Sequence, residues 1–441
     1  MSRQKRPLLM FYGDDFTGSA DLVMQYQRYG FPGLIFLGEP DVEKLREAAH
    51  RFPVVGIAGV TRAMAPGQIE RTIEPALRAF RDLEPDLVQY KVCSTADSSP
   101  TVGSFAPAIR LGRELWGKRP VPVLVAQPAL GRYTAFSNHF AVDRGVVYRL
   151  DRQPVMANHP STPMREADLR LHIAEQIGAP LGAVTLEDLR ASDCGEQCYR
   201  EASDAGLEAV VVDSMTTDDL RRAGELVLAS AGGSTVFAVG SGGLSTGVAA
   251  ALGGVRSIES PTVDAVGTPM LAVSGSCSPL TSDQIDSALN AGWVGIPLDS
   301  TIGDERWEAE LVRAEECALA ANRAGRNAVV YTCGVGRSRE SVPVSVTKVA
   351  GGLARIVRLV REEGTLDRAL IVGGDTSGHV VTELGAHAIL SKGVVGDHTL
   401  LFELQADDSV VDGLEAVLKG GQIGGEDFFE LVRTGSGRLT R

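Results

Sequence analysis

The chain has 441 residues, of which 44% are hydrophobic and 22% are charged. This composition is typical of a globular protein, and the length exceeds what one hydrophobic core usually organises, so two domains are expected. The 43 basic and 56 acidic residues give a net charge of -13. That charge argues against a general affinity for nucleic acid or for an anionic membrane surface.

The first apolar run, Leu8 to Tyr12, is far shorter than the roughly 18 residues of a membrane span. It has no small-residue cleavage site after it, so a strand is expected here rather than a signal peptide. The six cysteines are scattered and do not show zinc-ribbon spacing. Reduced thiols and a cytoplasmic location are therefore expected.

Two adjacent carboxylates, Asp14 and Asp15, follow this first run in the sequence GDDFTG. We expect them in a loop exposed at a cleft, with Thr17 capping the helix that follows. A purely structural explanation is that one aspartate caps the helix while the other is solvated. The alternative is that a hydroxylated ligand or a cation uses both, because neighbouring like charges otherwise repel each other.

Polar residues also follow two later apolar runs. Arg62 comes after the run PVVGIAGV, and Lys91, Ser94 and Asp97 come in or just after the run LVQYKV. A cation beside several hydroxyl groups suits an anionic polar molecule, and a guanidinium can bind a carboxylate through two parallel hydrogen bonds. Each motif alone is compatible with ordinary loop chemistry, but together they favour a pocket for a hydroxy acid.

Short apolar runs alternate with amphipathic segments along the whole chain. This pattern predicts an α/β protein of two domains, each a mainly parallel sheet flanked by helices, with a cleft between them. The segment from Gly253 to Pro269 is rich in glycine, proline and serine and is predicted to be a linker, which gives domains of residues 1–252 and 270–441. Ligands of such sheets bind beyond the carboxyl ends of the strands.

Two later turns, SGSCS at 274–278 and GGDTSG at 373–378, have the composition of phosphate-binding loops. Small residues let a ligand approach the backbone, and the start of the following helix favours an anion. Thr281 and Gln284 have capping-box spacing, which predicts that a helix starts there. Two ordinary strand-to-helix turns remain the alternative.

Other nucleotide motifs are weak or missing from the sequence. It contains neither a G-x-x-x-x-G-K-[ST] loop nor the H-R-D set of protein kinases. The segment GSGGLSTG, residues 240–247, loosely resembles a dinucleotide-binding motif. An NAD(P)-dependent oxidoreductase therefore stays open as an alternative function, on this segment and the α/β pattern alone.

Seven motifs occur in the order seen in the four-carbon acid sugar kinases, a family that includes threonate, erythronate and 3-oxo-tetronate kinases. They are GDDFTGSAD, VTRAM, YKVCSTADSS, HPSTPM, SGSCS, GGDTSG and LKGGQIGGEDFF. The resemblance implies ATP-dependent phosphorylation of a hydroxyl group on a four-carbon or similar acid sugar. It implies an N-terminal domain that binds the acid and a C-terminal domain that binds ATP, with Mg²⁺ as the accompanying cation.

The resemblance also carries over site residues by position. On the acid side these are Asp14 and Asp15, of which at least one is expected to be catalytic, with Arg62, Lys91 and Ser94; Asp97 is added from its place on the same turn. On the nucleotide side they are Ser274, Gly275, Ser276, Gly373, Gly374, Asp375, Thr376, Ser377 and Gly421. Asp375 is the expected metal partner, because it stands beside the predicted phosphates.

Among the chain's departures from the family pattern, one concerns a late motif on the expected nucleotide side. Lys419 to Gly424 read KGGQIG, where the family commonly has lysine, serine, glycine, asparagine, phenylalanine and glycine. This departure leaves open a non-catalytic sensor of sugar acids as a second alternative. The expected partners are a small sugar acid and ATP, with no nucleic acid and no membrane, and the sequence leaves a homodimer open.

Overall fold

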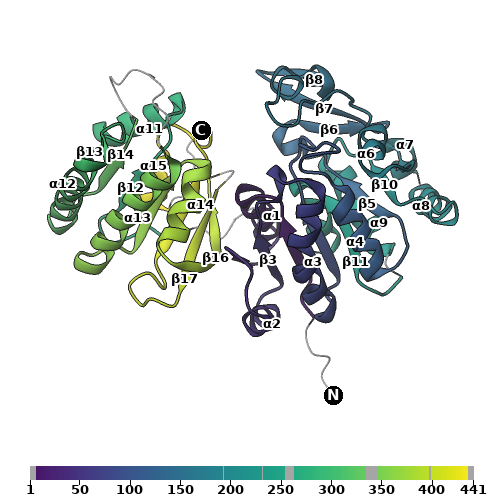
Figure 1. The fold of residues 1–441 in the computed structure, drawn as a ribbon, viewed down its shortest axis with the longest axis horizontal. Coiled ribbons are helices and arrows are strands. Elements are labelled where there is room, and N and C mark those ends of the chain that lie inside the picture. Colours follow the sequence, from purple (N-terminus) through teal and green to yellow (C-terminus); the bar gives the residue numbers. More distant parts are fainter. Residues whose placement is uncertain are drawn as a thin grey trace. The chain divides into compact units, whose positions relative to one another are not determined.

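The fold is described from a computed structural model that covers residues 6–191, 193–230, 232–253, 263–333, 345–396 and 399–435, with only the backbone of Asp375. The chain divides into two compact units, Met1–Arg256 and Ser257–Arg441. Figure 1 shows each unit as a sheet flanked by helices, the first coloured purple to teal and the second green to yellow. Residues 254–262 of the predicted linker lie outside the described residues.

The N-terminal unit is built on a parallel sheet with the strand order β2-β3-β1-β4-β11-β5-β10-β9. Its main strands and helices are β1 Leu9–Gly13, α1 Phe16–Gln27, β2 Gly33–Phe36, α2 Val42–Arg51, β3 Val54–Ala58, α3 Pro66–Asp82, β4 Leu87–Lys91, α4 Ala106–Trp116, β5 Val121–Leu124, α6 Leu169–Ile177, β9 Gly182–Val184, α7 Leu186–Arg190, α8 Cys194–Asp204, β10 Ala209–Val212, α9 Thr217–Ala229, β11 Val236–Gly240 and α10 Gly242–Ala251. Strands β1, β4 and β11 are buried along their whole length, which explains the apolar sequences of β1 and β11, whereas β4 also buries Gln89 and Lys91.

Helix α10 of this unit packs against both α1 and α9, and α4 packs against both α3 and α6. A separate antiparallel sheet follows β5 and consists of β6 Arg132–Ala135, β7 Asn138–Asp143 and β8 Val146–Arg149. The short helix α5, Pro154–Ala157, comes after it. The 3₁₀ turns of the unit are η1 Thr61–Ala63, η2 Pro128–Leu130 and η3 Leu150–Arg152.

The C-terminal unit has the strand order β13-β14-β12-β15-β18-β17-β16, which is parallel except that β17 runs antiparallel to both of its neighbours. Its elements are β12 Leu271–Ser274, α11 Pro279–Asn290, β13 Val294–Pro297, α12 Asp304–Arg323, β14 Ala328–Tyr331, α13 Val346–Glu363, β15 Arg368–Val372, α14 Gly374–Glu383, β16 Ala386–Val395, β17 Thr399–Ala406, β18 Glu415–Lys419 and α15 Phe428–Thr434. Helices α11 and α15 share one core cluster with the sheet, while α13 packs against both α12 and α14.

In each unit the strand order reverses beside one strand, and the predicted motifs follow the strands at that point. In the N-terminal unit, β2 and β3 lie on one side of β1 and β4 lies on the other. In the C-terminal unit, β14 lies on one side of β12 and β15 lies on the other. Loops diverge at such a switch point and leave room for a ligand beyond the carboxyl ends of the strands. The motifs GDDFTG and YKVCSTADSS follow one such pair of strands, and SGSCS and GGDTSG follow the other.

Two predicted helix starts are wrong, and in both cases a serine or aspartate closer to the strand is the cap. Helix α1 is capped by Asp15, whose side chain accepts a hydrogen bond from the N–H of Gly18, and not by Thr17. Helix α11 is capped by Ser278 and starts at Pro279, whereas the spacing of Thr281 and Gln284 predicted that Thr281 would be the cap. A serine followed by proline is a common helix start, because proline lacks the N–H that would otherwise need a partner.

No helix in the described part of the chain is both long enough and apolar enough to cross a lipid bilayer.

Candidate active site

The two aspartates that follow β1 lie against Arg62, which comes from the turn after β3. The Nε and Nη2 atoms of Arg62 donate to the two carboxylate oxygens of Asp14 at 3.0 and 2.8 Å, and Nη1 lies 2.6 Å from Oδ2 of Asp15. The backbone joins the same loops, since the N–H of Asp14 donates to the carbonyl of Lys91 at 2.9 Å. The ends of β1, β3 and β4 therefore form one charged cluster.

The two aspartates have different surroundings. The side chain of Asp14 is only 4% exposed, so it is not in an open loop as expected, whereas that of Asp15 is 29% exposed. Burial raises the pKa of Asp14, and the attraction of Arg62 opposes that rise. The purely structural explanation, in which one aspartate caps the helix and the other is solvated, is right for Asp15, which caps α1. It is wrong for Asp14, which is held in a buried ion pair.

This arrangement changes the expected part of Arg62. The fork of its guanidinium that was expected to bind a ligand carboxylate is occupied by Asp14. Three of its five N–H groups face the two aspartates, so at most two remain for a ligand. In this structure Arg62 first of all holds the two carboxylates in place.

Lys91 is buried at the end of β4, next to Asp21, which in turn bonds to Gln127; the sequence analysis missed both Asp21 and Gln127. Its Nζ donates to the carbonyl of Val92 at 2.9 Å and lies 3.6 Å from Oδ2 of Asp21. The side-chain amide of Gln127, after β5, donates to both oxygens of Asp21 at 3.1 and 3.2 Å. Asp21 was visible in the sequence as a carboxylate within the GDDFTGSAD motif, but only the fold shows that it faces Lys91.

Ser94 and Asp97 lie on the loop after β4, and among the described residues neither side chain forms a hydrogen bond or ion pair with the charged cluster. Asp97 accepts a hydrogen bond from Thr95 at 2.6 Å. The carbonyl of Ser94 accepts one from Nε2 of His139 at 2.8 Å, which leaves Nδ1 of His139 to accept from Thr134. Burial lowers the pKa of His139 to about 4, so this histidine stays neutral and acts as a fixed support for the loop.

In the C-terminal unit, the turns after β12, β15 and β18 meet through small residues. A Cβ on Gly275 would lie 2.7 Å from Oγ1 of Thr376, and one on Gly421 would lie 2.6 Å from Oγ of Ser276. Gly373 has a φ of +127°, which side chains rarely adopt, and it offers no side-chain cap to α14. The three turns are therefore packed closely, with the hydroxyl-bearing side chains of Thr376 and Ser276 against glycines of neighbouring turns, and a larger residue in place of either glycine would separate them.

Gly374 differs from these glycines because it occupies the first residue of α14 and a Cβ there would meet nothing within 4 Å. The first N–H groups of a helix have no partner within the helix, and they attract anions. Open space in front of such a helix end is what a bound phosphate requires.

The hydroxyl groups of these turns have internal partners. Ser377 donates to the carbonyls of Ile371 and Gly373 at 3.1 and 2.6 Å. Ser274 is fully buried and accepts from the N–H of Ser276 at 3.3 Å. These serines shape the turns through their side chains. The side chain of Asp375, the predicted metal partner, lies outside the described residues.

A disulfide joins Cys277, in the turn after β12, to Cys333, just beyond β14, with 5.1 Å between the Cα atoms. The expectation that all thiols are reduced is therefore wrong for this pair. A separation of 56 residues gave no hint of the pairing, which arises because β12 and β14 are neighbours in the sheet.

The glycines of GSGGLSTG serve close packing. A Cβ on Gly243 would lie 1.7 Å from the carbonyl of Ala126, and one on Gly247 would lie 2.1 Å from the carbonyl of Leu220. Helix α10 can therefore approach its neighbours only with glycine at these positions. This packing accounts for the segment without a dinucleotide and removes the main support for an oxidoreductase.

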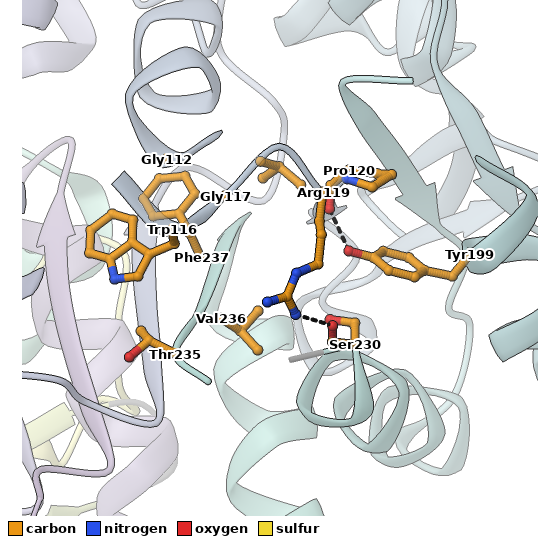
Figure 2. A pocket seen from close by; sticks show the side chains of 11 residues that line it. Gly112, Trp116, Gly117, Arg119, Pro120, Tyr199, Ser230, Thr235, Val236 and Phe237 are labelled. Atoms are coloured by element: carbon orange, nitrogen blue, oxygen red, sulfur yellow. Dashed lines mark hydrogen bonds between the residues drawn. The ribbon is translucent and has the colours of Figure 1, made fainter. Parts of the chain in front are cut away.

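A small pocket in the N-terminal unit, shown in Figure 2, lies away from these turns. It is lined by the first residues of β5 and β11, Val121 and Val236, so it lies at the amino ends of the strands. Its polar groups bond to the protein itself, since the hydroxyl of Tyr199 donates to Pro120 at 2.6 Å and Arg119 donates to Ser230 at 2.8 Å. It is not a candidate for the active site.

Comparison with known proteins gives a consistent result. Residues 9–248 match the family model of a sugar-binding N-terminal domain, and residues 271–429 match that of a nucleotide-binding C-terminal domain. A 3-oxo-isoapionate kinase of Paraburkholderia graminis is 36% identical over 97% of this chain and 94% of its own. A 3-oxo-tetronate kinase of Methylobacterium radiotolerans is 28% identical over 94% of this chain and 96% of its own.

The fold is shared with solved structures. A protein from Haemophilus influenzae superposes with a TM-score of 0.79 at 22% identity, covering 96% of this chain and 99% of its own. At this identity the likeness shows the fold alone. The two domain matches and the 36% identical relative show more: this protein is an acid sugar kinase and belongs to the four-carbon acid sugar kinase family.

Proposed function

We propose that the protein transfers a phosphoryl group from ATP to a hydroxyl group of a four-carbon or branched 3-oxo sugar acid. The observation that carries this proposal is the full-length similarity to a 3-oxo-isoapionate kinase, together with a charged cluster and a glycine-rich set of turns at the two switch points. Among the acids named for relatives, 3-oxo-isoapionate is our first candidate because its kinase is 36% identical, against 28% for a 3-oxo-tetronate kinase.

We assign the acid to the N-terminal unit. Lys91, Asp21 and the remaining N–H groups of Arg62 offer charge and hydrogen bonds to a carboxylate and several hydroxyls. Asp15 is the proposed general base, because its carboxylate is the more exposed of the adjacent pair and keeps lone pairs free after accepting from Gly18 and Arg62. Asp14 is the proposed positioning residue that fixes Arg62.

We assign ATP to the C-terminal unit. The open space before Gly374 and the uncapped start of α14 fit a phosphate group, and Gly275, Gly373 and Gly421 keep the surrounding backbone close. Mg²⁺ would neutralise charge on the phosphates, and it is usually held by the phosphates and one or two carboxylates. Asp375 is the proposed carboxylate, on the grounds of its place in the GGDTSG turn.

The proposal is tested by a coupled assay of ADP release with ATP, Mg²⁺ and a panel of acids. The panel contains 3-oxo-isoapionate, 3-oxo-tetronate, threonate and erythronate. We expect one or two of these acids to stimulate ADP release far above the rate without acid. Equal, background-level release with every acid would reject this substrate class.

Gly18→Ala is expected to damage acid binding selectively. The added Cβ would lie 2.5 Å from Oδ1 of Asp15 and 3.2 Å from Nζ of Lys91, so it would push the two charged groups apart. We expect KM for the acid to rise about tenfold or more, by the loss of one charge-assisted contact, while KM for ATP stays unchanged. An equal rise in both KM values would contradict our assignment of the acid to this unit.

A further inference from the structure

Two lysines occupy matching places in the two units. Lys91 is the last residue of β4, and Lys419 is the last residue of β18. Both are almost fully buried, and each donates from Nζ to the carbonyl of the next residue, at 2.9 Å for Lys91 and 3.0 Å for Lys419. The two lysines differ in whether a carboxylate lies near the ammonium group.

Lys91 has Asp21 as a counter-charge, 3.6 Å away. Lys419 has no carboxylate within ion-pair distance among the side chains that the structure describes, and the ring of Phe428 lies 5.8 Å from its Nζ. An ammonium group has three N–H donors, and a buried charge is normally paired. A ligand anion is the partner that this environment lacks.

The position of Lys419 places it among the proposed phosphate-binding turns. Its backbone carbonyl accepts the N–H of Gly373 at 2.8 Å, and Val372 is its partner in the neighbouring strand. The turn that it begins is tied to the start of α11, because the carbonyl of Gly421 accepts from the hydroxyls of Ser278 and Thr281. The turns after β12, β15 and β18 thus converge next to this lysine.

We propose that Lys419 is a phosphate-binding residue, whose ammonium group supplies the positive charge for a phosphate of the nucleotide held by these turns. This inference rests on the proposed placement of ATP in the C-terminal unit. It also gives the divergent KGGQIG motif a function, since the lysine of the family pattern is retained while Gly420, Gln422 and Ile423 differ from it. Burial lowers the pKa of Lys419 to about 8, in accord with a charge that lacks its partner.

The test is Lys419→Met, a side chain of similar length without charge. Calorimetric titration with ADP is expected to show an affinity about 10- to 150-fold weaker than that of the wild type, the range for a hydrogen bond to a charged group. The melting temperature without ligand is expected to stay the same or rise, because an unpaired buried charge has been removed. Lys419→Arg should recover part of the lost affinity.

Lys392→Met is the matched control, since Lys392 is an exposed lysine of the same unit that pairs with Glu403 at 2.9 Å. It should bind ADP as the wild type does. Unchanged ADP affinity in Lys419→Met, or a loss that comes with a lower melting temperature and is not recovered by arginine, would overturn the phosphate-binding role alone. Failure of the wild type itself to bind ADP would overturn the proposed nucleotide site as well.

Discussion

Gly374→Val is expected to abolish tight ATP binding in a protein that remains folded. The backbone of Gly374 is not in the left-handed region, and a Cβ there would meet nothing within 4 Å, so the fold has room for the new side chain. A ligand phosphate at the start of α14 would meet the valine methyl groups instead. We expect the affinity for ATP to fall by about 100-fold or more, since two or more charge-assisted hydrogen bonds would be lost.

The chain provides a matched control for this variant. Gly351 lies within α13 of the same unit, and a Cβ there would also meet nothing within 4 Å. Gly351→Val should therefore fold and bind ATP like the wild type in calorimetric titrations. A folded Gly374→Val protein with the ATP affinity of Gly351→Val would remove our placement of the phosphate.

Asp15→Asn is expected to lower kcat by about 10² to 10⁴-fold, the usual effect of removing a general base. Its stability should change little, because asparagine caps a helix as well as aspartate does and can still accept from the N–H of Gly18. The measurement is kcat at saturating substrates together with the melting temperature. Turnover within a few-fold of the wild type would show that Asp15 is not the base.

Asp14→Asn distinguishes the proposed positioning role of Asp14 from the proposed general-base role of Asp15. Asp14 lies in a buried ion pair with Arg62, so removal of its charge should lower the free energy of unfolding by about 3 kcal/mol. Urea denaturation of both variants gives the comparison. A stability loss in Asp15→Asn that equals the loss in Asp14→Asn would mean that the two carboxylates share the structural role.

The α/β fold could be predicted because its central strands are buried on both faces and most of their sequences are continuous apolar runs, as in β1 and β11. The strand order could not, yet it is the order that brings Arg62 next to Asp14 and Cys277 next to Cys333. The antiparallel sheet of β6, β7 and β8 was not predicted, because its strands are short and β8 is largely exposed.

The candidate site was predicted as a set of residues rather than as a set of contacts. Spacing placed Asp14, Asp15 and Lys91 at strand ends, where the structure finds them. It could not show that the fork of Arg62 faces Asp14, since that depends on side-chain direction. Asp21 and Gln127 were missed because a polar residue within a helix or in the turn after a strand is ordinary until the fold reveals its partner.

The most direct test of the account is to observe the product of the complete reaction. The wild-type protein is incubated with ATP, Mg²⁺ and 3-oxo-isoapionate or another acid of the panel, and the mixture is followed by ³¹P NMR. We predict a new phosphomonoester signal on the acid that grows in equal amount with ADP. Binding of both ATP and acid without any phosphomonoester signal would contradict the account and would favour a sensor of sugar acids instead.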